Sequence, residues 1–256
     1  MKLVTPAEQA RQNQRRIQVN GREYTLSEYV GAAPTHGKYV DGNESNDNGM
    51  PQGFLVHQPP NAITPAHFHE PNQFQIFVGG GGRLGAFPAN PLTVQYANGH
   101  TPYGPIVAGP EGVEYFTLRQ RWDPGAKYMP ASRDLLRKGN QRARIKGGLA
   151  AISAEERAAL TEAKIEVIFA PEADGLAGWL YRLGANGSVT LPQPSDAGGQ
   201  YLIVTHGALM HDGAGLTPLS TIYLTSDEAG MTAAAGGEGL DLLVLQFPRM
   251  AASQAA

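Results

Sequence analysis

The stretch His67-Phe68-His69-Glu70-Pro71-Asn72-Gln73-Phe74-Gln75-Ile76-Phe77-Val78-Gly79-Gly80 decides the fold. Side chains of a β-strand point alternately to its two faces, so His67 and His69 are expected on one face of an extended segment. Two imidazoles placed in this way can form half of the coordination shell of zinc, iron, copper or nickel. The alternative is a metal-free pocket, in which both histidines line a polar interior and bond to neighbours and water.

This stretch resembles the first motif of the cupin superfamily, in which a His-x-His pair is followed by three or four residues, a glutamate, six residues and a glycine. Gly80 stands at the expected glycine, and Gln73 stands at the glutamate. A neutral amide is a poorer metal ligand than a carboxylate, because it brings no charge to offset the cation. Glu70 could supply that charge, but it follows His69 directly and should point to the opposite face unless Pro71 breaks the alternation.

The second cupin motif usually supplies a last histidine, and its match here is the segment 98–107. Tyr103 stands in the histidine's place. His100 lies three residues earlier, and this odd offset puts it on the other face unless the backbone bulges near Gly99. Both residues are therefore candidates to complete the site.

Three arrangements remain open. His67, His69 and His100 form a three-histidine site, or Gln73 and Tyr103 complete a weaker site with water. In the third, the pocket is metal-free and the same groups act through hydrogen bonds and acid–base chemistry.

The resemblance implies that a divalent transition metal (Fe, Mn, Ni or Zn) is the cofactor. Its predicted ligands are His67, His69, Gln73 and His100. Glu70 and Tyr103 are predicted to be catalytic. Substrate binding is predicted for the planar fork of Arg119 or Arg121 on one strand face and for the ring of Phe77.

The composition favours many short strands joined by tight turns. The 256 residues include 32 glycines and 19 prolines, and only 17% are charged. There is no cysteine, which excludes disulfides, cysteine catalysis and Fe–S ligation. The net charge of −3 does not provide the excess of positive charge that is typical of nucleic-acid-binding proteins.

The N-terminus lacks the apolar core of a signal peptide, and no apolar run approaches the ~20 residues needed to span a bilayer. We therefore expect a soluble cytoplasmic protein without membrane partners. The expected partners are a small-molecule substrate and a second copy of the chain in a homodimer.

The two halves of the chain resemble each other. Gly199-Gln200-Tyr201-Leu202-Ile203-Val204-Thr205-His206-Gly207 echoes the segment 72–80, with a glutamine at the same relative place. The paired histidines are missing from the second copy, where Gln193 and Ser195 stand instead. The sequence is thus similar to a bicupin whose C-terminal barrel has lost its ligands, and we expect that barrel to be metal-free and mainly structural.

The predicted fold is all-β, with two cupin (double-stranded β-helix or jelly-roll) barrels joined by a short helical connector. The predicted parts are an N-terminal arm (1–20), an N-terminal barrel with the site (21–130), the connector (131–163) and a degenerate C-terminal barrel (164–256). A capping-box sequence, Ser153-Ala154-Glu155-Glu156, marks a helix in the connector. Residues 41–49 are predicted to form a loop, since they are dense in turn-favouring residues.

The resemblance implies a small-molecule enzyme with its site in the N-terminal barrel. Cupins include dioxygenases and other oxidoreductases, lyases and isomerases, and a fold does not select among these reactions. The alternative is a non-catalytic module that binds a metabolite or sugar, which the replacement of the usual glutamate and last histidine favours.

Overall fold

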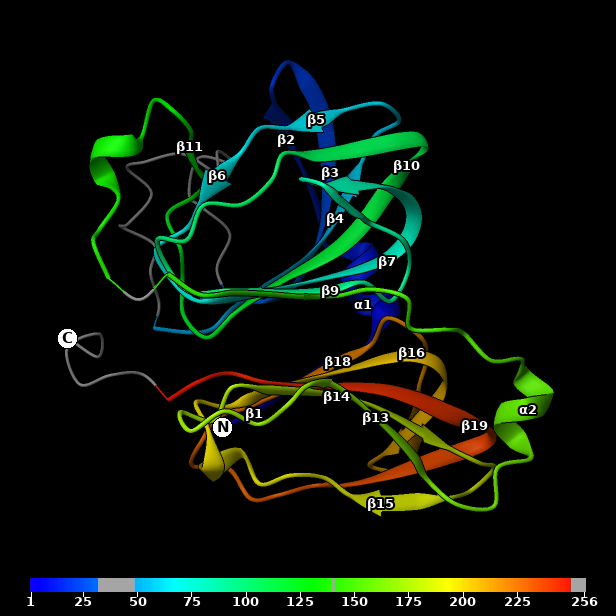
Figure 1. Ribbon diagram of the computed structural model, residues 1–256. Helices are drawn as coiled ribbons and strands as arrows, with labels where there is room; N and C mark the ends of the chain where they lie inside the picture. Colours follow the sequence, from blue (N-terminus) through cyan, green and yellow to red (C-terminus); the bar gives the residue numbers. More distant parts are fainter. Residues whose placement is uncertain (32–48, 140, 250–256) are drawn as a thin grey trace. The chain divides into compact units, whose positions relative to one another are not determined.

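The computed structural model describes residues 1–31, 49–139 and 141–249, so that the predicted loop at 41–49 lies outside the described residues except for Gly49. The chain divides into two compact units. The N-terminal unit is Ala10–Ala150, and the C-terminal unit joins Met1–Gln9 to the residues from Ala151 onward (Figure 1). Among the described residues, no helix is long and apolar enough to cross a membrane.

Antiparallel strands build the N-terminal unit. They are β2 (Gln14–Val19), β3 (Arg22–Val30), β4 (Gln52–Gln58), β5 (Ile63–Thr64), β6 (His67–Phe68), β7 (Gln73–Leu84), β8 (Phe87–Pro88), β9 (Val94–Ala97), β10 (Ile106–Arg119), β11 (Lys127–Tyr128) and β12 (Ala143–Lys146). The main sheet runs in the order β12-β9-β7-β10-β4-β3-β2, with β5 paired to β10 and β8 paired to β7. Strands β6 and β11 form a separate pair.

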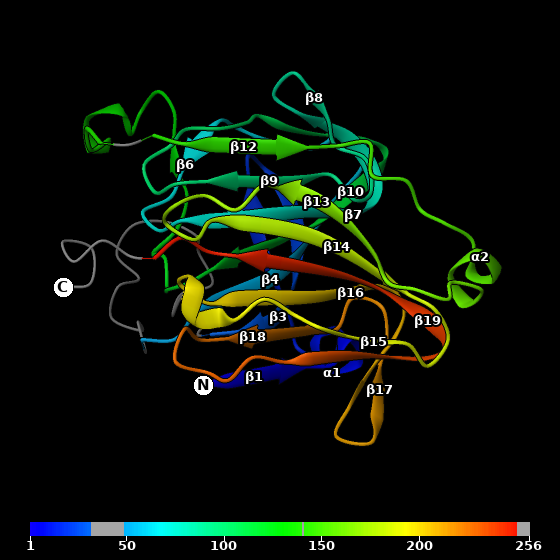
Figure 2. The ribbon, with the colours of Figure 1, turned by 60° about the horizontal axis from the view of Figure 1, so that its bottom comes forward.

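A second antiparallel sheet builds the C-terminal unit. Its strands are β1 (Lys2–Thr5), β13 (Lys164–Phe169), β14 (Ala177–Leu183), β15 (Ser188–Thr190), β16 (Gln200–His211), β17 (Ala214–Leu216), β18 (Thr221–Leu224) and β19 (Thr232–Gln246). The order is β1-β18-β16-β19-β14-β13, with β15 paired to β19 and β17 to β16. Strand β1 therefore lies at the edge of this sheet, beside β18 (Figure 2).

The expected all-β fold is confirmed, since the described residues form antiparallel sheets with only short helices. The predicted arm and connector are more structured than expected. Within residues 1–20, β1 pairs with β18, the helix α1 (Ala7–Gln12) follows, and β2 pairs with β3. The segment 131–163 is only partly helical, since β12 joins the N-terminal sheet between the 3₁₀ turn η2 (Arg133–Leu135) and the helix α2 (Ala154–Ala158).

The predicted capping box begins α2. The Ser153 hydroxyl accepts a hydrogen bond from the Glu156 backbone N–H, and the Glu156 carboxylate accepts one from the Ser153 N–H. Helix α2 is then held to β19 by a buried ion pair, in which Arg157 Nε donates to Asp241 Oδ1 over 2.9 Å. Because both side chains are buried, removal of either one would leave an uncompensated charge in the interior.

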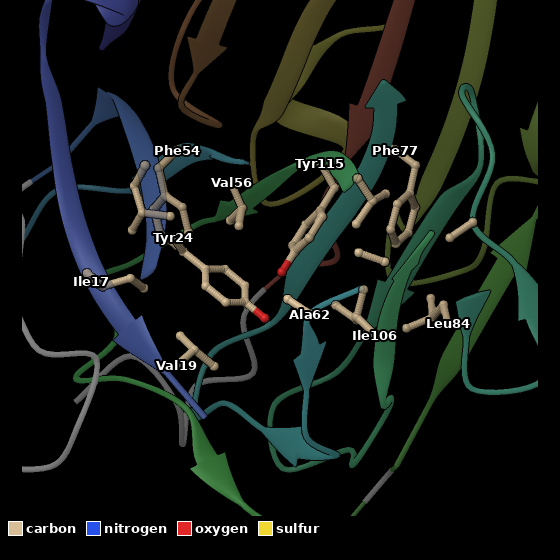
Figure 3. Packing of buried hydrophobic residues seen from close by; sticks show 14 residues of the cluster. Ile17, Val19, Tyr24, Phe54, Val56, Ala62, Phe77, Leu84, Ile106 and Tyr115 are labelled. Atoms are coloured by element: carbon tan, nitrogen blue, oxygen red, sulfur yellow. The ribbon is translucent and has the colours of Figure 1, made fainter. Parts of the chain in front are cut away.

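The core of the N-terminal unit follows from the two-residue period of its strands. Tyr24 on β3 and Tyr115 on β10 turn their rings into the same interior (Figure 3). Phe77 on β7 packs against Tyr115, with the ring centroids 5.3 Å apart. The other buried members of this core are Ile17, Val19, Leu26, Phe54, Val56, Ala62, Leu84, Ala89, Ile106, Ala108 and Val113.

The glycine at the end of the motif is a steric necessity. Gly80 has φ +61°, and a Cβ there would lie 2.2 Å from the Gly112 carbonyl oxygen of β10, which is far inside van der Waals contact. The close approach of β7 and β10 at this point therefore requires a residue without a side chain.

Replacing Gly80 by alanine tests this requirement. The matched control is Gly21→Ala, since Gly21 has φ +73° but nothing within 4 Å of its Cβ position. Both variants place alanine in the left-handed region, at a cost of about 1–2 kcal/mol. The clash adds to this cost only at Gly80, so we expect Gly80→Ala to lose at least about 2 kcal/mol more than the control in urea unfolding. Equal losses would contradict the steric explanation.

Candidate active site

Two histidines enter the site from β6. His67 and His69 flank Phe68, and alternation along the strand sends both imidazoles to one side, where they are 4% and 6% exposed. Tyr128 of β11 pairs opposite His67, and a bridge links His67 to Tyr103. The two imidazole rings meet edge to face, with their centroids 5.1 Å apart. The two-residue spacing of His67 and His69 in the sequence thus predicts correctly that their side chains lie on the same side.

Each histidine has one ring nitrogen bonded to an acceptor outside the cavity. His67 Nδ1 lies 2.7 Å from the Pro65 carbonyl oxygen, and His69 Nδ1 lies 2.7 Å from Asp123 Oδ2. A carbonyl and a carboxylate only accept hydrogen bonds, so in both neutral rings the proton is on Nδ1. Nε2 is therefore the acceptor nitrogen of each ring, and in His69 it already lies 3.2 Å from Arg119 Nη2.

Burial keeps both rings neutral. Desolvation, followed by the proximity of His69, lowers the pKa of His67 to about 3. Desolvation and the Arg119 guanidinium lower the pKa of His69. Burial alone would raise the pKa of Asp123, but His69, Arg119 and the hydrogen bonds that it accepts bring it down to about 2. The centre thus holds two neutral imidazoles backed by one carboxylate.

A chain of side chains from neighbouring strands completes the cluster. Gln73 Nε2 donates to the Tyr103 hydroxyl, and Arg119 Nε donates to Gln73 Oε1 over 3.2 Å. Arg119 Nη1 donates to Gln52 Oε1, and Nη2 lies 3.1 and 3.2 Å from the two ring nitrogens of His69. Because Tyr103 accepts from Gln73, its own O–H proton is directed elsewhere, toward a ligand or water.

The cluster closes one end of a cavity of about 60 Å³. The other end of this cavity is apolar and formed by side chains of the core, among them Ile17, Leu26 and Phe54. Tyr103 also lines a second cavity of about 330 Å³ between β8, β9 and β12. The phenol therefore forms a wall shared by a small cavity and a larger one of ligand size.

His100 does not join the cluster. Its backbone has φ +57°, its Nδ1 accepts a hydrogen bond from the Arg137 N–H over 3.3 Å, and its ring lies 5.3 Å from that of Phe68. Phe68 points away from the neighbouring histidines, so His100 lies on the opposite side of β6, as its odd offset indicates. The three-histidine arrangement is therefore not assembled.

Three more predicted site residues lie elsewhere. The carboxylate of Glu70 contacts Lys127 Nζ at 3.3 Å and does not line the cavity. Arg121 is exposed and lies beyond the end of β10, while Arg119, the last residue of that strand, is 1% exposed. Phe77 lies in the apolar core, where it contacts Tyr115.

Sequence reasoning missed three members of the cluster. Asp123, Gln52 and Gln75 are buried beside the cluster. Asp123 and Gln52 stand in segments without a recognisable motif, and Gln75 lies inside the first motif at a position to which the motif assigns no role. Gln52 lies directly opposite Arg119 in the register of β4 and β10. Only strand pairing, which the sequence alone does not specify at this precision, brings them together.

The donor atoms do not fit a resident divalent metal. Both groups of the Gln73 amide are engaged, with Tyr103 and with Arg119. A guanidinium stands beside His69, and its charge would repel a cation bound at the same imidazole. Among the described residues, no three histidine, aspartate or glutamate side chains converge where they could hold a metal ion.

A second polar chain crosses β3, β4 and β10. Ser27 Oγ lies 2.9 Å from His57 Nε2, and His57 Nδ1 lies 2.8 Å from Glu114 Oε1, an order similar to that of a serine hydrolase triad. Ser27 is 1% exposed, however, and its hydroxyl also accepts a hydrogen bond from Gln14. A substrate could not reach it, so these residues form a cross-strand hydrogen-bond network.

Comparison with known proteins places the fold. No family model matches the chain, and no curated protein matches it. A candidate dioxygenase from Nostoc punctiforme is similar in structure, with a TM-score of 0.64, 12% identity, and 98% of this chain and 84% of that chain covered. Oxalate decarboxylase from Lactobacillus farciminis follows, with a TM-score of 0.59, 12% identity and coverages of 96% and 86%. The fold is that of the cupin proteins.

The bacterial pirin YhhW from Escherichia coli, solved in complex with nickel(II), is also similar. Its TM-score is 0.53, the identity is 11%, and the match covers 98% of this chain and all of the pirin. At these identities the likeness concerns the cupin fold, and the chemistry has to be argued from the side chains of this chain.

The neutral, buried His67 should make the protein less stable in acid. Its pKa is lowered from 6.5 to about 3, so the unfolded state binds the proton more readily and stability is lost as the pH falls through this window. We expect His67→Gln to remove on the order of 4 kcal/mol of this pH dependence in urea unfolding between pH 6.5 and 3.

The matched control is His211→Gln, in the C-terminal unit, where the partner of the histidine, Asp212, is 85% exposed. This variant should follow the steep pH dependence of the wild type. A His67→Gln curve parallel to that of the wild type would show that His67 is not held neutral.

Proposed function

We propose that the protein is a cupin-type enzyme that transfers a proton on a small carbonyl compound, an isomerase or lyase reaction, in the cavity of the N-terminal unit. One observation carries the proposal: hydrogen-bond acceptors and donors meet at the same end of that cavity. The acceptors are Nε2 of His67 and of His69, and the donors are the Tyr103 hydroxyl and the Arg119 guanidinium.

Removal of a proton beside a carbonyl group needs these two kinds of group together. A base takes the proton from carbon, while donors stabilise the negative charge that develops on the carbonyl oxygen. Of the two histidines, His69 is the better base, because the Asp123 carboxylate behind its Nδ1 partly offsets the burial and the Arg119 charge that lower the pKa of the ring. Tyr103 and Arg119 then act on the oxygen.

His67 has a different environment and we assign it a different role. Its Nδ1 is bonded to the neutral carbonyl of Pro65, which stabilises an imidazolium less than a carboxylate does. It therefore serves as a hydrogen-bond acceptor that positions a substrate hydroxyl. The cavity of about 330 Å³ on the other side of Tyr103 offers space for the remainder of a larger substrate.

The neighbours of known structure suggest other chemistry. The candidate dioxygenase and the nickel-bound pirin support metal-dependent oxidation for a protein of this fold in general. The predicted transition-metal site at His67 and His69 stays a prediction, which the engaged amide of Gln73 and the guanidinium of Arg119 weigh against. The proton-transfer proposal needs only the side chains described.

We further propose that the chain is a bicupin whose C-terminal barrel is structural. The unit built on β16 and β19 has its own antiparallel sheet and apolar core, and Gln200 on β16 occupies the place that Gln73 has on β7. Gln200 donates to Gln246 and to the Pro192 carbonyl, which are contacts typical of a structural side chain.

Solvent deuterium exchange tests the proposed reaction. Small carbonyl compounds (pyruvate, glyceraldehyde and dihydroxyacetone) are incubated with the protein in D₂O, and the loss of the C–H signal is followed by proton NMR. We expect catalysed exchange for at least one of them, reduced by about 100-fold or more in His69→Gln and in Tyr103→Phe. The control, His211→Gln, should retain the wild-type rate.

Two outcomes would count against this reaction. Exchange that is unaffected by His69→Gln and Tyr103→Phe would place the chemistry elsewhere. Binding of these compounds without any exchange would favour the alternative, a non-catalytic module that binds a metabolite.

A further inference from the structure

We infer that the guanidinium of Arg119 is the fixed cation of this cavity, and that it receives an anionic oxygen directly, so that the natural ligand is a small carboxylate that also carries a hydroxyl group. The inference rests on the proposed function only in placing the ligand in this cavity. It concerns what the site binds, whereas the proposed function concerns what the site does to it.

Arg119 is held rigidly at the end of β10. In the sheet, Gln73 of β7 and Gln52 of β4 lie directly opposite it on either side, and both amide oxygens accept hydrogen bonds from its guanidinium. The guanidinium also lies over the ring of Phe54, 5.5 Å from the ring centroid. A guanidinium fixed in this way is a preorganised positive charge for an anionic oxygen, because little side-chain entropy remains to be lost on binding.

Arg119 supplies the formal charge on the wall of the cavity. Among the described residues that line it, Arg119 is the only one with a formal charge, since both histidines are neutral. Asp123 offsets this charge in part, with Oδ2 3.7 Å from Arg119 Nη1, but it lies behind His69 and does not line the cavity. A ligand that enters therefore meets a positive charge.

The same charge opposes a metal ion at the histidines. At a separation of 4 Å and an effective dielectric constant near 20, each positive charge on an ion is repelled by the guanidinium enough to weaken binding by about a thousandfold. A cupin motif with glutamate at position 73 would add a negative charge at this point, whereas this chain has a neutral amide already bonded to Arg119. The positive charge of Arg119 and the loss of a negative charge at position 73 thus both disfavour a cation at the histidines.

Gln75 indicates a second group on the ligand. It is 2% exposed, it lines the cavity, and its side-chain oxygen has no hydrogen-bond partner among the described residues. A buried carbonyl oxygen without a partner is costly, and a ligand hydroxyl that donates to it would remove the cost. The cavity of about 60 Å³ limits the part of the ligand that it encloses to a few non-hydrogen atoms.

Calorimetric titration with glycolate and with glycolamide, in the presence of EDTA, tests the anion site. The two probes share their shape and their hydroxyl group and differ in charge. We expect glycolate to bind at least about 10-fold more tightly than glycolamide, and this preference to fall in Arg119→Lys, which keeps a charge but loses the planar fork. Arg121→Lys, two residues away and exposed, is the matched control and should bind as the wild type does.

Acetate separates the contribution of the hydroxyl group. Gln75→Met should weaken glycolate binding and leave acetate binding almost unchanged. Equal affinities for glycolate and glycolamide, or no binding of glycolate at all, would overturn the inference.

Zinc titration tests the other half of the inference. Protein purified without a metal-affinity column and dialysed against EDTA should show no tight site for Zn²⁺. The double variant Gln73→Glu/Arg119→Met should gain affinity of at least about 100-fold, because it removes the cation and restores an anion beside the histidines. Addition of His67→Gln should abolish this gain.

The wild-type titration decides the question even if the double variant does not fold. Tight, stoichiometric binding of Zn²⁺ to the wild type, lost in His67→Gln, would overturn the inference while leaving the proton-transfer reaction open. If glycolate binds selectively but no probe exchanges deuterium, the inferred anion site stands and the proton-transfer reaction is overturned.

Discussion

The buried carboxylate of Asp123 is the interaction on which the site depends. It accepts hydrogen bonds from His69 Nδ1 and from the backbone N–H groups of Glu70 and Gly125, and thereby ties the turn after β6 to the turn after β10. A carboxylate that is 0% exposed is stable only with such donors and a countercharge, which Arg119 supplies at 3.7 Å. Asp123 therefore fixes the tautomer of His69 and the position of the guanidinium at once.

Strand register extends this constraint across the sheet. Gln73, Arg119 and Gln52 occupy directly opposite positions on β7, β10 and β4, so the two amides hold the guanidinium from both sides. Replacement of the usual motif glutamate by Gln73 is consistent with this arrangement, because an amide can accept from Arg119 and donate to Tyr103 at the same time. A carboxylate could accept from both but donate to neither. The amide and the arginine are therefore best understood as one unit.

Local pattern alone predicted the parts of the site that depend on one strand. Alternation placed His67 and His69 together, and the odd offset of His100 indicated correctly that it would need an irregular backbone to join them. Asp123 has no motif around it, and its proximity to His69 depends on pairing between segments far apart in the chain. Arg119 and Arg121 have the same parity, and only the end of β10 at Arg119 separates the buried one from the exposed one.

The fold and the chemistry of this chain depend on different residues. Gly80 is required by the close approach of two backbones, whatever the neighbouring side chains do. The charge at the histidines, in contrast, depends on the side chains of Gln73 and Arg119 at strand ends and of Asp123 in the turn after β10, and the backbone pairing of the strands does not itself use these side chains. By this argument the same backbone can carry a centre that attracts cations or one that attracts anions. Similarity of fold to enzymes with a metal says little about the sign of the charge in the cavity, which these side chains determine.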